Sequence, residues 1–184
     1  PSSRWYSGSG IYRDVKLSVT DKVHVAKYGT TITSPKLEEQ KNGTVDTLVK
    51  SRIVNQDDQA HSIYAEYEIV DQNGQVVSEK VRSEVQSVLA GQEINLSHTL
   101  HVEKPTLWDV KTNNPALYTL YTRVYRDSQL VDVQKERFGY RYLNWTPEGG
   151  FFLNGAATKF HGVSLHHDHG ALGAEENYKA EYRR

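Results

Sequence analysis

The 184-residue chain contains no cysteine, no methionine and only five prolines. Without cysteine it can form neither a disulfide framework nor a thiolate zinc site. The same absence suits a secreted bacterial protein as well as a cytosolic one, so the compartment stays open. Because the chain begins at Pro1 and contains no methionine, we expect it to be an internal piece of a longer protein.

The chain also lacks an excess of charge and any long apolar run. Its 22 basic residues nearly balance its 23 acidic residues, and no block of like charge offers a surface for a nucleic acid backbone. No stretch of about 18 apolar residues is present, so we expect no insertion into a membrane. The length suits one complete domain together with pieces of others. We therefore expect neither nucleic acid nor membrane lipid among its partners.

Alternating apolar and polar residues, the pattern of a β-strand with one buried face, recur along the middle of the chain. The clearest run lies at 93–102, where apolar residues alternate with polar ones over ten positions. The residues that we expect to face inward are Ile94, Leu96, Leu100 and Val102 in this run, and Val45, Thr47, Val49, Ile53, Ile63, Ala65, Tyr67, Ile69, Val77, Val81, Val85, Leu89, Tyr118, Leu120 and Val124 in the others.

Turn sequences of suitable chemistry separate these runs. "DQNG" at 71–74 offers an Asn-Gly pair for a tight hairpin, and "RDSQ" at 126–129 offers a second turn. About seven strands fit between 22 and 143, with no room for helices between them. The pattern predicts an all-β fold, an immunoglobulin-like β-sandwich of about seven antiparallel strands. Its core must rest on aliphatic and tyrosine packing, because no disulfide is available.

The two ends of the chain differ from the middle. Residues 1–20 hold a turn rich in glycine and serine and one strand, which is too little to bury a core. Near the other end the sequence predicts a hairpin, with strands at 151–153 and 159–163 and a turn at 154–155. The spacing of apolar residues over 174–184 predicts the start of an amphipathic helix.

Titratable groups are concentrated at His166, His167, Asp168 and His169, within the stretch "GVSLHHDHGALG". With His161 nearby they supply enough nitrogen and oxygen ligands for zinc, but alternate side chains of an extended segment point to opposite sides. A hydrolytic centre would need a nucleophile motif such as G-x-S-x-G, which the chain lacks. A third interpretation is that the histidines form hydrogen bonds within a loop. The residues alone leave these alternatives open.

Three aromatic residues, Trp5, Tyr6 and Trp108, have the chemistry to stack on the apolar face of a sugar ring. Packing in a core or between domains is the competing interpretation, and it is the one that we expect.

Several motifs together resemble glycoside hydrolase family 2. "RWYSGSGIYRDVKL" at 4–17 resembles the end of that family's sugar-binding jelly-roll domain. "PTLWDVKTNNPALYTL" at 105–120 and "ERFGYRYL" at 136–143 resemble its immunoglobulin-like second domain. "FFLNGAATKFHGVSLHHDHGALG" at 151–173 resembles the start of its catalytic (β/α)8 barrel. The motifs follow the order of the family, which makes the resemblance specific.

The resemblance implies three regions. Residues 1–20 would be the end of the sugar-binding domain, residues 21–144 the whole immunoglobulin-like sandwich, and residues 145–184 the first strand, loop and helix start of the barrel. Apolar residues of the last region would lack part of their cover in this chain. We therefore expect 145–184 either to pack against the sandwich or to mediate self-association.

The form "HHDHGALG" resembles the β-galactosidase branch of the family. The resemblance therefore implies a retaining enzyme that acts on β-galactosides with two glutamates, one as acid/base and one as nucleophile. In the family both glutamates lie on later barrel strands, so we expect no catalytic residue in this chain and no hydrolysis by it alone. The resemblance also implies Mg²⁺ or Na⁺ as a cofactor of the full-length protein, with no cofactor bound by this piece.

Two residues are assigned to substrate binding through the resemblance. His166 matches the family histidine that follows the first barrel strand and contacts the sugar, where barrel enzymes build their active sites. Asp168 falls where some members place another polar residue near that pocket. Some members have arginine and asparagine before the histidine, where this chain has Leu165 and Ser164. Two alternatives remain, a parent that is a β-glucuronidase or β-mannosidase, and an adhesive module that binds glycans or proteins.

Overall fold

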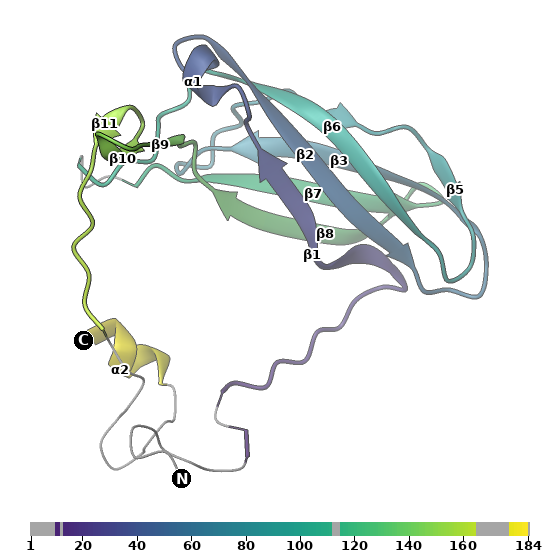
Figure 1. Cartoon of the computed structure of the whole chain (residues 1–184). Coiled ribbons are helices and arrows are strands. Elements are labelled where there is room, and N and C mark those ends of the chain that lie inside the picture. Colours follow the sequence, from purple (N-terminus) through teal and green to yellow (C-terminus); the bar gives the residue numbers. More distant parts are fainter. Residues whose placement is uncertain (1–9, 12, 112–114, 165–176, 184) are drawn as a thin grey trace. The chain divides into compact units, whose positions relative to one another are not determined.

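The structure, a computed structural model, describes residues 10–11, 13–111, 115–164 and 177–183 (Figure 1). The chain forms two compact units, one of Thr20–Lys159 and one that combines Pro1–Val19 with Phe160–Arg184. Among the described residues no helix has the length and apolar character needed to cross a bilayer.

Two antiparallel sheets build most of the larger unit. The first has the order β1-β2-β6, with β1 at Val23–Thr33, β2 at Thr44–Asn55 and β6 at Glu93–Glu103. The second has the order β4-β3-β7-β8, and β5 also pairs with β3. Its strands are β3 (His61–Val70), β4 (Val81–Arg82), β5 (Gln86–Val88), β7 (Tyr118–Arg126) and β8 (Gln129–Phe138). Figure 1 shows the two sheets as the layers of a sandwich, which confirms the predicted all-β, immunoglobulin-like fold.

The core lies between the two sheets and follows the predicted alternation. On β2, Val45, Val49 and Ile53 are completely buried, and the residues on the other face between them are half-buried or exposed. The same pattern holds on β3, β6 and β7. Each buried aliphatic side chain stabilises the fold by about 1.5–3 kcal/mol relative to an exposed one, before the loss of conformational entropy. The fully buried members include Ile63, Ala65, Tyr67, Ile69, Leu100, Leu120 and Val124.

The predicted inward positions on the edge next to β3 are partly wrong. Val85 and Leu89 are 53% and 65% exposed, whereas Val88 is buried. The register explains the difference, because Tyr67 pairs with Val81 but Ile63 pairs with Gln86, so one extra residue enters the edge strand between the two pairs. A one-residue bulge turns every following side chain to the opposite face.

Both predicted turns of the sandwich form. At 71–74 the Gly74 N–H donates to the Asp71 carbonyl, and Gly74 has a φ of 79°. The turn at 126–129 links β7 to β8 with two left-handed residues, Asp127 at a φ of 49° and Ser128 at 69°. Two such residues define the turn type that matches the twist of a hairpin.

Replacing Ser128 with glycine is expected to raise the free energy of unfolding by about 0.5–1 kcal/mol. The left-handed conformation costs a residue with a side chain about 1–2 kcal/mol, and the greater freedom of glycine in the unfolded chain offsets about 0.5–1 kcal/mol of the gain. Urea denaturation measures the change. The matched control is Ser62→Gly in β3, where the same substitution in an extended strand should lower stability. Loss of stability in both variants would contradict the strain at Ser128.

Three short strands follow the sandwich in the same unit. They are β9 (Leu143–Thr146), β10 (Gly150–Leu153) and β11 (Ala156–Ala157), paired in the order β11-β10-β9. No expected strand corresponds to β9, which runs across the expected boundary between residues 144 and 145. The assignment of 145–184 to a barrel, like the other two region assignments, stays a prediction.

The turn predicted at 154–155 forms, with φ of 52° at Asn154 and 79° at Gly155. The predicted second strand at 159–163 is wrong, because a two-residue turn lets pairing resume at once and Leu153 pairs with Ala156. Phe151 and Phe152 are half-buried in this small sheet, whereas Phe160 and Val163 beyond it are exposed. Self-association through 145–184 stays a prediction.

The smaller unit contains little regular structure within its described residues. Residues 13–19 form no strand, and most of the remaining range in which the sequence predicts one, 1–9 and 12, lies outside the described residues. The helix α2 at Tyr178–Arg183 lies within the predicted helical range, and the rings of Tyr178 and Tyr182 stack with centroids 6.2 Å apart.

Candidate functional site

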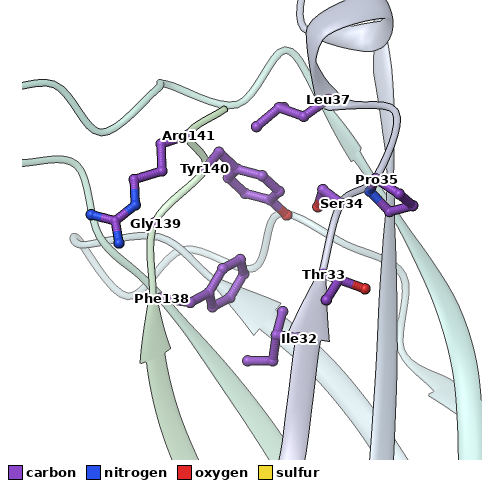
Figure 2. Close-up of a pocket in the computed structure, with 9 residues that line it drawn as sticks. All are labelled: Ile32, Thr33, Ser34, Pro35, Leu37, Phe138, Gly139, Tyr140 and Arg141. Carbon is purple, nitrogen blue, oxygen red and sulfur yellow. The ribbon is translucent and has the colours of Figure 1, made fainter. Parts of the chain in front are cut away.

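A pocket of about 430 Å³ opens where the end of β1 faces the end of β8 (Figure 2). The short helix α1 at Leu37–Gln40 follows β1 and contributes Leu37 to the lining. Figure 2 shows the Tyr140 ring between the β1 and β8 segments, with its hydroxyl toward Ser34, while Arg141 extends away from the other lining side chains. The complete lining is Ile32, Thr33, Ser34, Pro35, Leu37, Phe138, Gly139, Tyr140 and Arg141.

The chemistry of this pocket does not suit hydrolysis. The Tyr140 hydroxyl lies 2.8 Å from Thr47 Oγ1 in a buried hydrogen bond, and burial raises the pKa of Tyr140 far above its usual range. The phenol therefore stays neutral at ordinary pH. None of the lining residues is a carboxylic acid, whereas a glycosidase needs two carboxyl groups on either side of the bond that it breaks. The pocket offers apolar contact without an acid and a base.

Trp108 is half-buried and packs against the segment 139–141 that follows β8. Its backbone N–H donates to the Tyr140 carbonyl at 2.8 Å, and the Arg141 guanidinium lies 4.9 Å from the centre of its ring. A Cβ on Gly139 would lie 2.9 Å from the Trp108 Cβ, so only glycine fits beside it. Trp5 and Tyr6, the other two candidates for sugar stacking, lie outside the described residues.

A charged cluster that the sequence analysis missed lies where the β2–β3 loop meets the β7–β8 hairpin. His61 Nδ1 lies 2.7 Å from an Asp127 carboxylate oxygen, and His61 Nε2 lies 3.2 Å from Asp57. Lys22 donates to the other oxygen of Asp57 at 2.9 Å. His61 and Asp127 are 66 positions apart, so no local motif signals the pair. The cluster ties the loops together at this end of the sandwich.

The cluster predicts a pH-dependent contribution of His61 to stability. The hydrogen bond with Asp127 raises the pKa of His61 above its usual value, although burial opposes the shift. A histidine with a raised folded pKa stabilises the fold fully below its unfolded pKa of about 6.5 and loses this contribution as the pH rises through the folded pKa. His61→Gln should therefore destabilise the protein more at about pH 5.5 than at about pH 8.5.

Urea denaturation of wild type and variant at both pH values checks this prediction. The control is His98→Gln, because His98 Nδ1 accepts a hydrogen bond from the Thr99 N–H rather than facing this cluster. The control should not reproduce the larger loss of stability at acidic pH, because it removes no contact with Asp127 or Asp57. A larger effect of His61→Gln at the alkaline pH would show that His61 is neutral in the folded protein.

The residues assigned to substrate binding lie outside the described part of the chain. This applies to His166 and Asp168, and equally to His167 and His169. His161 and Ser164 are described, and both are exposed. Within the described residues no three or more histidine, aspartate or glutamate side chains are arranged to hold a metal ion. The Mg²⁺ or Na⁺ cofactor stays a prediction for the full-length protein.

The larger unit has the two-layer architecture of an immunoglobulin-like β-sandwich. The sequence model of Glycosyl hydrolases family 2 matches residues 23–141, more than half of the chain. The chain therefore belongs to glycosyl hydrolases family 2.

Individual relatives extend the similarity beyond the sandwich. A β-galactosidase of Bacteroides ovatus, BoGH2A, is 39% identical over 98% of this chain and 20% of its own length. A putative β-glucuronidase of Formosa agariphila is 30% identical over 94% of this chain and 15% of its own length. The crystal structure of a family member from Bacteroides cellulosilyticus superposes with a TM-score of 0.84 at 32% identity, over 98% of this chain and 24% of that one. The chain thus spans about a fifth of the length of these proteins.

Proposed function

We propose that the full-length protein is a retaining glycoside hydrolase that releases terminal β-galactosyl residues. The observation that carries the proposal is the 39% identity to a β-galactosidase over 98% of the chain, a range that extends past the sandwich on both sides. In such an enzyme one carboxyl group protonates the leaving oxygen and a second carboxylate attacks the sugar. We propose that both glutamates belong to parts of the protein beyond this chain.

In this proposal the chain has two tasks. The sandwich is a rigid spacer, consistent with its buried core and the absence of a carboxyl pair from its described pocket. The segment after β11 contributes His166, and with less support Asp168, to one wall of the sugar pocket. These side chains would bind and orient the galactose without taking part in proton transfer or bond cleavage.

The test compares nitrophenyl glycosides on the full-length protein and on this chain alone. We expect the full-length protein to release nitrophenol from the β-galactoside and the isolated chain to give no turnover above a blank. Absence of turnover of every β-glycoside by the full-length protein would overturn the hydrolase proposal. Turnover by the isolated chain would overturn its role as a spacer.

A second candidate is a β-glucuronidase, because a putative enzyme of that kind is 30% identical over 94% of the chain. The two substrates differ at two positions of the sugar: a glucuronide carries a carboxylate at C6 where the galactoside has a hydroxymethyl group, and its C4 hydroxyl has the opposite configuration. Comparison of kcat/KM for the β-galactoside and the β-glucuronide decides between them. If the enzyme prefers the glucuronide, the proposed substrate changes from a β-galactoside to a β-glucuronide. The proposed retaining mechanism stays the same.

A further inference from the structure

In the described part of the chain the sandwich has four sheet edges, and three of them are interrupted. β1 has a register shift between Val25 and Thr30, and its Val25 N–H donates to the Asp132 side chain of β8 at 2.9 Å. β8 has a register shift of its own, opposite Val124 and Tyr125. The edge next to β3 is divided by a bulge into β4 and β5, of two and three residues. Interruptions of this kind prevent a sheet from adding a strand of another chain.

The fourth edge, β6, is continuous. All eleven of its residues pair with β2 without a register shift, and none of them is proline or lysine. Within the described residues β6 pairs with no strand other than β2. A pocket of about 320 Å³ lies between 95–98 of β6 and the segment 82–86, so the facing sheet leaves the middle of this edge open. A long and accessible edge without interruptions is a template for another strand.

The backbone groups that face outward from β6 follow from its bonds to β2. Just outside the strand, the Gln92 carbonyl accepts from the Asn55 N–H and the Lys104 N–H donates to the Gly43 carbonyl, both at 2.8 Å. In an antiparallel pair every second residue exchanges hydrogen bonds with its partner, and the residues between direct their backbone groups to the other side. Because 92 and 104 are both even, the odd-numbered residues of β6 direct their N–H and carbonyl groups away from β2.

The hydrogen bond of Thr99 supports this assignment. Its N–H donates to His98 Nδ1 at 3.1 Å, and not to β2. Asn95 and Ser97, which precede it at the same spacing, are exposed and carry no charge. The outward groups of Asn95, Ser97 and Thr99 therefore form a row of alternating donors and acceptors, in which His98 already occupies the Thr99 N–H.

We propose that the β6 edge binds the same edge of a second copy of this chain, in an antiparallel arrangement with a two-fold axis at Ser97. Ser97 of each copy then exchanges two backbone hydrogen bonds with Ser97 of the other, and Asn95 pairs with Thr99 on either side of the axis. The Thr99 N–H exchanges its bond with His98 for one with a carbonyl of the second copy. The result is a continuous six-stranded sheet in the order β1-β2-β6-β6-β2-β1. The proposal does not depend on the activity of the full-length protein.

The charges along β6 favour this register. With the axis at Ser97, Glu93 lies opposite His101 of the second copy, twice by symmetry, and a carboxylate opposite a basic ring stabilises a cross-strand pair. Both side chains are about half exposed, at 51% for Glu93 and 50% for His101, so a second copy can reach them. With the axis at His98, Glu93 would lie opposite Glu103, and like charges in this position destabilise a pair. The β6 edge is therefore complementary to itself when the axis lies at Ser97.

The first test removes a hydrogen bond donor from the proposed axis in the full-length protein. Ser97→Pro removes the outward N–H without removing a bond to β2, and edge strands tolerate proline. The matched control is Gln72→Pro, at the second residue of the 71–74 turn, where proline is favoured. Sedimentation velocity over a range of concentrations measures the dissociation constant of the dimer. We expect it to rise by about tenfold in Ser97→Pro, because two hydrogen bonds are lost, and to stay unchanged in Gln72→Pro.

A second pair of variants tests the register without introducing proline. His101→Glu places two carboxylates opposite each other at both ends of the contact and should raise the dissociation constant. His101→Lys keeps a basic group opposite Glu93 and should leave the dissociation constant close to that of the wild type. Because residue 101 is exposed, we expect both variants to fold, and their melting temperatures check this.

Hydrogen–deuterium exchange locates the contact on the chain. We expect the amides of 95–99 to exchange more slowly at high protein concentration, where the dimer forms, than at low concentration. A wild type that is monomeric at every concentration would overturn the proposal, as would a dimer that neither Ser97→Pro nor His101→Glu weakens. Slow exchange of these amides in the monomer would also overturn it, because a segment of the same molecule would then cover the edge.

Discussion

Replacing Leu100 with alanine is expected to lower the free energy of unfolding by about 3 kcal/mol. Leu100 is completely buried on β6, where it faces the opposite sheet. Removal of a buried leucine side chain costs its transfer free energy together with the cost of the cavity that remains, about 2–5 kcal/mol in total. With no disulfide between its sheets, this sandwich depends on such contacts for its stability.

Urea denaturation of the chain, followed by tryptophan fluorescence, measures the effect. The control is Leu89→Ala, because Leu89 is 65% exposed although the alternation in the sequence places it inside. Exposed substitutions of this kind change stability by less than about 0.5 kcal/mol. If Leu89→Ala were as costly as Leu100→Ala, the register that places Val88 inside would be wrong.

These two leucines show where the alternation in the sequence predicts burial correctly and where it does not. Leu100 lies in a strand whose register with β2 is unbroken over eleven pairs, so the simple period of two predicts its burial. Leu89 follows the bulge at the edge of the other sheet. There the Ser83 hydroxyl accepts a hydrogen bond from the Ala65 N–H, which replaces a regular backbone pair. Apolar spacing alone carries no signal of such a bulge.

The candidate site also combines features that the local sequence predicts with contacts that only the fold creates. Trp108 and Asn154 lie in two of the sequence motifs that resemble family 2, and the turn at 154–155 forms as predicted. Their contact joins residues that are 46 positions apart, and only the fold brings them together. The His61 cluster is likewise assembled from three separate loops. Hydrogen bonds between such segments depend on topology, which periodicity does not encode.

The second large effect is expected at His166, in the full-length protein. Replacing His166 with alanine should lower kcat/KM for the β-galactoside about 10- to 100-fold. We propose that this histidine contacts the sugar, and a hydrogen bond to a charged group contributes about 1.5–3 kcal/mol, where about 1.4 kcal/mol equals a factor of ten. The matched control is His167→Ala, since the neighbouring histidine has no assigned role and should tolerate the change.

Separate measurement of kcat and KM then shows whether the contact of His166 with the sugar forms in the ground state or only in the transition state. An equal fall in kcat and kcat/KM would mean that the interaction forms only in the transition state, while a higher KM at constant kcat would mean that it holds the ground state equally well. We expect the first pattern, because a glycosidase distorts the sugar ring as the bond breaks and strengthens its contacts there. Unchanged kcat/KM in His166→Ala would refute the assignment of this residue, and an equal loss in His167→Ala would show that the whole segment had been disturbed.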